Sequence, residues 1–300
     1  MFTKCEAFKV VGEIEGKDLW VSKKGFYMLW FEFLADSPSY ELARRYRTNT
    51  LSPQDQQQLP TDFDQVLSVY DDFGDVQRQQ FTQWWDETGM QICAFRSRKP
   101  RITKVTALPR KRTDVNKIKS DVENYITTSW PSEGRQNTLL LALPIGLTKA
   151  NIAKQISSIL GKYPEGVKKI NPRPPKYALQ GKRQNKDMLF RYMHVLRARS
   201  ERPNLTLWRI GVRTGVSDTY SRELDHEAKV VPNEGTYDRM MLTIITSRAF
   251  LRGKLIAENA ARGVFPSYSA CPHAIEPDLS ESHKRFASRR KWLKAQANDV

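Results

Sequence analysis

Five aspartates gather between residues 62 and 75, namely Asp62, Asp64, Asp71, Asp72 and Asp75. Paired carboxylates can hold a divalent metal ion for phosphodiester hydrolysis. These acids flank an expected helix rather than recurring on one face of it, and no lysine or histidine stands among them. A solvated helix face and loop is therefore the favoured interpretation, and a metal-dependent nuclease is the alternative.

Other residue types that could support catalysis lack a suitable pattern. The three cysteines are widely spaced, the four histidines have no zinc-ligand spacing, and Cys271-Pro-His273 fits a surface turn better than a metal fragment. The motifs GxxxxGK[ST], GxSxG, HExxH and GxGxxG are absent. We therefore expect no catalytic residue, no metal and no cofactor.

The stretch Leu205–Leu224, LTLWRIGVRTGVSDTYSREL, has residue types that could read DNA. A helix-turn-helix needs a buried residue and a small residue in its first helix, a glycine-like turn and apolar anchors in its second helix. These roles fall in turn to Ile210, Gly211, Gly215, Val216 and Leu224.

The second helix of this unit would present the side chains that read bases. Ser217 is a suitable N-cap, so the following polar residues are expected to face the major groove, with Arg222 able to reach a guanine edge or a phosphate. The predicted DNA-binding residues here are Ser217, Asp218, Thr219, Ser221 and Arg222.

The segment IGVRTGVS resembles the turn of bacterial helix-turn-helix regulators of the IAxxTGVS type. The resemblance implies recognition of duplex DNA. Ser221 stands where the pattern has an aliphatic residue, so either Tyr220 takes over the packing or the second helix is shifted. A helix pair that only packs is the alternative.

Hydrophobic periodicity and capping residues predict the elements that must position this stretch. Ser37 is expected to cap a helix that begins at Pro38, and Gly89 to end a helix that begins at Val76. The other expected elements are helices over 26–34, 63–70, 149–160, 186–200 and 237–263, a short strand over 138–144 and a basic helix near the C-terminus.

Charge divides the chain unequally. The formal net charge is +16, yet residues 1–95 hold nine lysines and arginines against fifteen acids. The excess of cations therefore lies in the remaining residues and points to a polyanionic partner. Further phosphate-contacting residues are predicted at Lys182, Arg183, Arg191, Arg197, Arg199, Arg213, Arg289 and Arg290.

These observations predict a mainly α fold with a short β element, in which an acidic helical N-terminal module precedes a basic module that contains the helix-turn-helix. The expected boundaries are an acidic domain at 1–95, a basic linker or hairpin at 96–137, a basic domain at 138–265 and a tail helix at 266–300. The basic residues of the linker fit a segment that is only exposed to solvent as well as they fit one that contacts nucleic acid.

Most of the chain also resembles uncharacterised proteins of bacterial chromosomes and mobile elements. The matching segments are EFLADSPSY, FGD followed by WW, KYALQGKR followed by VLRAR, and RGKLIAENAARGVFP. The resemblance implies a bacterial source and carries no activity.

The sequence therefore predicts a cytoplasmic protein that binds specific double-stranded DNA, either a transcriptional regulator or a mobile-element protein, with no membrane contact. Its N-terminal domain is expected to contact another protein or a second copy. The alternatives are a protein that binds RNA or single strands, with bases stacked on Tyr177, Tyr192 or Trp208, and a metal-dependent nuclease or antiphage effector.

Overall fold

The computed structural model describes residues 14–15, 19–21, 23–99, 101–111, 113–163, 174–181, 185–229, 231 and 234–298. The chain divides into two compact units. Unit 1 consists of Met1–Gly12, Lys23–Ile92 and Tyr177–Val300, and unit 2 consists of Glu13–Ser22 and Cys93–Lys176. A unit boundary lies between Ile92 and Cys93, close to the predicted boundary at residue 95. The acidic N-terminal helices nevertheless share unit 1 with the helix-turn-helix region and do not form a unit of their own.

Helix α2 (Lys24–Asp36) occupies the centre of unit 1. Its sequence is apolar on every side, and all residues from Gly25 to Asp36 are buried. Such a helix must be covered all round, and α2 contacts helices from both ends of the sequence. The indole Nε1 of Trp30, for example, donates a hydrogen bond to the Ala260 carbonyl oxygen at 3.2 Å.

The first half of unit 1 continues with short helices, the first two of which begin at a side-chain cap. The Ser37 side chain accepts a hydrogen bond from the Tyr40 amide and Pro38 occupies the first turn, as predicted. Ser52 and Asp55 form a reciprocal capping box. The helices are α3 (Pro38–Arg47), α4 (Pro53–Gln57) and α5 (Phe63–Phe73).

The helix predicted from Val76 begins later and does not stop at Gly89. It consists of α6 (Phe81–Trp84), a π-helical segment η1 (Trp85–Gly89) and α7 (Met90–Cys93). A Cβ at Gly89 would lie 2.8 Å from the Trp84 ring and 2.9 Å from the Trp85 ring. Gly89 is therefore explained by the close approach of two indoles rather than by a helix end.

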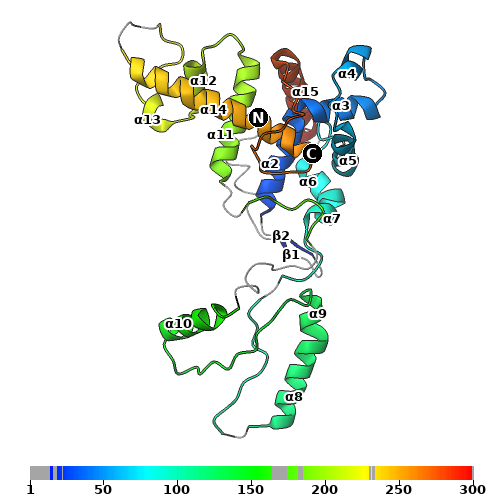
Figure 1. Ribbon diagram of the computed structural model, residues 1–300, viewed down its shortest axis with the longest axis vertical. Helices are drawn as coiled ribbons and strands as arrows, with labels where there is room; N and C mark the ends of the chain where they lie inside the picture. Colours follow the sequence, from blue (N-terminus) through cyan, green and yellow to red (C-terminus); the bar gives the residue numbers. More distant parts are fainter. Residues whose placement is uncertain are drawn as a thin grey trace. The chain divides into compact units, whose positions relative to one another are not determined.

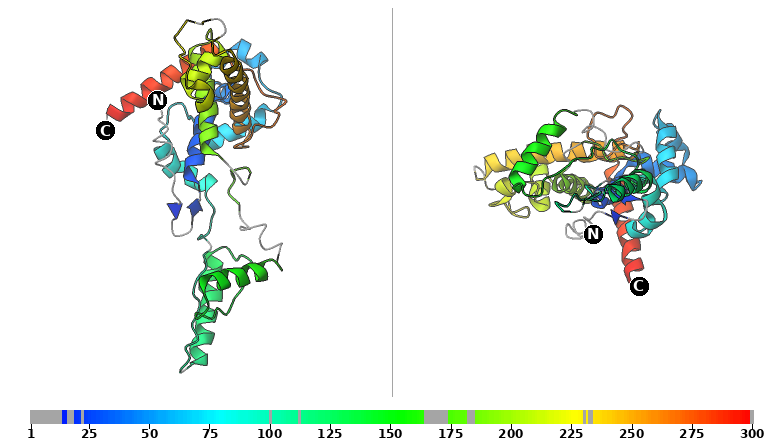
Figure 2. Two further views of the ribbon diagram at one scale, coloured as in Figure 1. Left: turned by 90° about the vertical axis from the view of Figure 1, so that its left-hand side faces the viewer. Right: turned by 90° about the horizontal axis from the view of Figure 1, so that it is seen from below.

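The C-terminal part of unit 1 is a group of helices around α14 (Figure 1). Helix α14 packs against both α11 and α12, and α15 packs against α11. The C-terminal end of α15 extends away from the other helices of this unit (Figure 2). The bounds are α11 (Lys186–Glu201), α12 (Leu207–Thr214), α13 (Asp218–Ser221), α14 (Thr236–Ala260) and α15 (Leu279–Asn298).

Unit 2 contains the β structure. Strands β1 (Ile14–Glu15) and β2 (Trp20–Val21) pair antiparallel, with Ile14 opposite Val21 and Glu15 opposite Trp20. Trp20 also bridges to Phe95, and the two rings stack with centroids 4.5 Å apart. The predicted fold class, mainly α with a short β element, is confirmed.

The helices of unit 2 bury little. They are α8 (Val115–Asn124), the π-helical segment η2 (Tyr125–Ser129), α9 (Trp130–Ser132) and α10 (Lys149–Leu160). Neither α8 nor α10 has a buried residue, although Thr148 caps α10 as predicted. The strand predicted over 138–144 is wrong: this run is irregular, and Leu140 is 55% exposed.

No helix in the described part of the chain has both the length and the apolar character needed to cross a membrane.

Candidate nucleic-acid interface

The tight turn predicted after Thr214 is present between α12 and α13. Gly215 adopts a left-handed conformation, with φ 59° and ψ 41°. Its amide donates to the Val212 carbonyl, and the Val216 amide donates to the Gly211 carbonyl, each at 3.1 Å. Glycine suits this conformation because it has no Cβ to clash with the following carbonyl. Val216 is buried directly after the turn, which fixes the direction in which α13 leaves.

Helix α14 supports α12 from behind. Ile210 is fully buried, and a Cβ at Gly211 would collide with the Thr246 hydroxyl of α14 and lie 3.3 Å from Leu242. The small residue was predicted where α12 touches α13, yet the tightest contact is with α14. This contact holds α12 rigidly, because the packed backbone leaves no space for a side chain.

Helix α13 is a single turn, which is shorter than a complete recognition helix. The Ser217 side chain makes no capping hydrogen bond, contrary to the prediction; instead, the Ser217 carbonyl accepts the Ser221 hydroxyl at 2.5 Å. Tyr220 is half-buried and contacts Tyr237 edge-on, with ring centroids 6.2 Å apart. Helix α13 therefore exposes few side chains to solvent.

Three of the predicted base-reading residues are exposed at this element. Asp218 and Thr219 are exposed in α13, and Arg222 is exposed directly after it. Ser217 and Ser221 are half-buried. Arg213 is exposed at the end of α12, where it forms an ion pair with Glu201 at 3.5 Å. The structure thus brings an arginine on each side of the turn to the surface.

Arg209 holds the segment that follows α13, a role that the sequence analysis missed. Its guanidinium donates to the His226 carbonyl at 2.5 Å and to the Ala228 carbonyl at 2.8 Å. It also lies over the Trp208 ring, with 4.8 Å from its Cζ atom to the ring centroid. Partners seventeen and nineteen residues away give no periodic signal in a sequence. Arg209 therefore supports the candidate interface without being part of its exposed surface.

Two predicted phosphate contacts are wrong, because Arg197 and Arg289 are used inside unit 1. Arg197 donates to Glu32 at 2.9 Å and to Asp36 at 2.9 Å. Arg289 donates to the other Glu32 oxygen at 2.6 Å and to the Val76 carbonyl. Each guanidinium compensates a buried carboxylate and is not presented to solvent.

The two carboxylates of this buried cluster differ in their titration. Burial alone would raise the pKa of Glu32, but Arg289 and Arg197 outweigh this effect and lower its pKa to about 2. Burial dominates at Asp36 and raises its pKa to about 6, although Arg197 opposes the shift. Glu32 is therefore the firmly ionised partner of both arginines.

The remaining predicted basic residues have different environments. Arg199 donates to the Leu205 carbonyl at 2.7 Å, Arg191 is half-buried and Arg290 is exposed on α15. Lys182 and Arg183 lie outside the described residues. Of the predicted cations of α11 and α15, Arg290 is thus the one on an exposed position.

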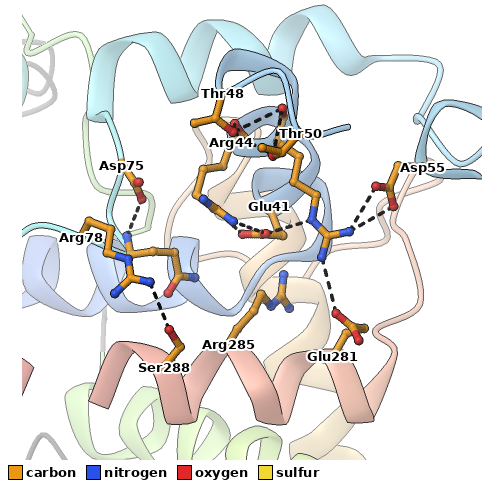
Figure 3. Close-up of polar contacts among 12 residues, drawn as sticks. Glu41, Arg44, Thr48, Thr50, Asp55, Asp75, Arg78, Glu281, Arg285 and Ser288 are labelled. Atoms are coloured by element: carbon orange, nitrogen blue, oxygen red, sulfur yellow. Dashed lines mark hydrogen bonds and ion pairs between the residues drawn. The ribbon is translucent and has the colours of Figure 1, made fainter. Parts of the chain in front are cut away.

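A second charged cluster joins α3, α4 and α15 (Figure 3). Glu41 accepts hydrogen bonds from Arg44 at 2.7 Å and from Arg45 at 3.0 Å, and Arg45 also reaches Asp55 at 3.1 Å. Burial opposes ionisation of Glu41, but the arginines outweigh it and lower its pKa. These cations, too, are matched by carboxylates of the same unit.

Three of the five aspartates considered as metal ligands are bound to separate partners. Asp62 pairs with Arg262 at 2.6 Å, Asp71 pairs with Arg47 at 2.6 Å, and Asp72 accepts the Tyr177 hydroxyl. No group of three or more potential ligands that could hold a metal occurs among the described residues. Tyr177 and Tyr192, which were considered for base stacking, are buried.

Comparison of the chain with protein-family models, curated proteins and solved structures found no match.

Proposed function

We propose that the protein binds specific sequences of double-stranded DNA through the turn between α12 and α13. The observation that carries the proposal is the left-handed turn at Gly215, which leaves Arg213, Thr219 and Arg222 exposed on a packed helical support. A rigid support keeps such side chains at fixed positions against base edges.

In this proposal the exposed residues have distinct roles. Arg222 donates to guanine O6 and N7 or to a phosphate, while Thr219 contacts a base edge or the backbone. Arg213 exchanges its long contact with Glu201 for a phosphate oxygen, since a surface ion pair costs at most about 1 kcal/mol to break. A single-turn α13 limits direct readout to a few base pairs.

The biological setting is part of the same proposal. A basic bacterial protein with a helix-turn-helix-like element fits a transcriptional regulator or a DNA-binding protein of a mobile element, acting in the cytoplasm where the DNA is. The net charge of +16 supports it, because a field of this sign attracts polyanions over long distances.

Fluorescence anisotropy with Arg222→Ala tests the proposal. We expect wild type to select duplexes from a genomic fragment pool, and the variant to lose about 1–3 kcal/mol of discrimination while keeping salt-dependent background binding. The matched control is Arg248→Ala, which removes an exposed arginine of α14 outside the turn. Equal binding of wild type to random duplex, selected duplex and single-stranded RNA would contradict sequence-specific readout.

A further inference from the structure

Unit 2 carries most of its cations without matching acids. Residues 93–163 contain fourteen lysines and arginines against four aspartates and glutamates. The densest part is 96–119, with ten basic residues and Asp114 as the one acid. The described residues of this segment form an irregular stretch followed by the first turns of α8.

The cations of unit 2 are also available at its surface. Within the described residues, ten of them are exposed and form no ion pair or side-chain hydrogen bond: Arg96, Lys104, Arg110, Lys111, Lys117, Lys119, Arg135, Lys149, Lys154 and Lys162. Exposed, unpaired cations at this density repel one another, and a bound polyanion would relieve that repulsion.

The α12–α13 turn, which is proposed to select the DNA sequence, has few exposed and unpaired cations. Around α12 and α13, the exposed cations are Arg202, Arg213, Arg222 and Lys229, and Arg213 is already paired. Proteins that bind duplex DNA with strong salt dependence neutralise about 6–10 phosphates. The turn alone therefore offers too few contacts for tight binding, and other surfaces must supply the remainder.

We infer that unit 2 is the main phosphate-binding surface of this protein and holds the nucleic-acid backbone while the α12–α13 turn selects the sequence. This inference rests on the proposed function and divides it between two surfaces. Unit 2 contributes affinity and salt dependence, whereas Arg222 and its neighbours contribute discrimination.

An acidic protein is the competing partner, because unit 2 also exposes aliphatic side chains such as Leu140 and Ile145. These side chains lie in 136–148, which contains no charged residue. Exposed aliphatic side chains also occur inside the dense cationic segment, at Ile102, Leu108 and Val115, so apolar exposure alone does not separate the two partners. The ten cations and one acid of 96–119 favour the partner that offers negative charge alone. Duplex DNA presents one charge for about every 1.7 Å of its axis and needs no apolar contact.

A matched pair of triple variants tests the inference. Lys104→Gln, Lys111→Gln and Lys119→Gln together remove three exposed charges from unit 2. Arg248→Gln, Lys291→Gln and Lys294→Gln remove three exposed charges from unit 1, outside the α12–α13 turn. Binding of a random duplex is measured by anisotropy across a series of salt concentrations, with circular dichroism to verify that each variant is folded. A further measurement tests whether poly-glutamate, added at the same concentration of charges as the duplex, displaces the duplex from the protein.

For the unit 2 variant, we expect the slope of log affinity against log salt to become less steep by about 2–3, and affinity at low salt to fall by at least about tenfold. The unit 1 variant should change the slope by less than about 1, and poly-glutamate should compete weakly. Equal slope changes in the two variants would overturn the inference and leave DNA binding intact. Strong competition by poly-glutamate would also overturn it in favour of an acidic protein partner. Absence of duplex binding by wild type would instead reject the proposed function.

Discussion

The two units of this protein differ in whether their lysines and arginines are paired with carboxylates. In unit 1, arginines such as Arg197, Arg262 and Arg289 are matched by buried or half-buried carboxylates. In unit 2, most described cations are exposed and have no acidic partner. The cations of the chain therefore have two roles: in unit 1 many of them stabilise the interior, and in unit 2 most of those described form a positively charged surface.

The largest expected effect comes from the buried cluster of unit 1. Glu32→Ala removes the shared partner of Arg197 and Arg289 and leaves two buried cations poorly compensated. We expect a loss of about 3–5 kcal/mol in the free energy of unfolding, measured by urea denaturation. The control is Glu123→Ala, an exposed acid of α8 in unit 2, which should change stability by less than about 0.5 kcal/mol. Similar losses of unfolding free energy in both variants would contradict the view that buried ion pairs stabilise unit 1 in particular.

Adding a methyl group should destabilise unit 1 more than unit 2, with a smaller effect than the loss of Glu32. Gly211→Ala places a methyl group against Thr246 and should destabilise the protein by about 1–3 kcal/mol. Gly146→Ala in unit 2 meets no atom within 4 Å and should be nearly neutral. Combining Gly211→Ala with Thr246→Ala should recover part of the loss in thermal denaturation. A full, additive loss in the double variant would show that α14 does not confine Gly211.

The pH dependence of stability provides the most specific test. The folded-state pKa of Asp36 is raised from 3.8 to about 6, so the folded state binds this proton more tightly than the unfolded state does. This group therefore makes stability fall as pH rises from about 4 to 6, by at most about 1.4 kcal/mol per pH unit. Glu32 acts oppositely, but below about pH 4.5, because its folded pKa is about 2.

Urea denaturation at several pH values across this window should give a shallower fall for Asp36→Asn than for wild type. An unchanged slope would mean that Asp36 is ionised in the folded state throughout the window, as firmly as Glu32 is.

Local signals in the sequence predicted much of the secondary structure. The uniformly apolar run predicted the buried helix α2, Ser37 and Pro38 predicted the start of α3, and Thr148 predicted the start of α10. The left-handed turn followed from Gly215 in its sequence context. In each case the signal lies within a few residues of the element, where capping and hydrophobic periodicity act.

The predictions failed where a residue contacts a partner that is distant in sequence. Arg197 appeared as an outward-facing cation of an amphipathic helix, but its partner Asp36 is 161 residues away. The run at 138–144 has the composition of a strand, yet a strand needs a neighbouring ladder and none of the described residues provides one. The sequence pattern also indicated no end for α13, which is a single turn in the structure.

The order of the segments has a consequence for synthesis on the ribosome. Unit 2 interrupts unit 1 between Ile92 and Tyr177, so α2 leaves the ribosome long before its partners α11 and α14 have been made. At about 5–20 residues per second, the 161 residues between Asp36 and Arg197 take on the order of ten to thirty seconds. Throughout this interval α2 has only the nearby segments, such as α3, α5 and α6, to cover it, and its two acids lack Arg197 and Arg289. Nascent chains should therefore need a chaperone at α2, and chains that terminate within unit 2 should aggregate or be degraded.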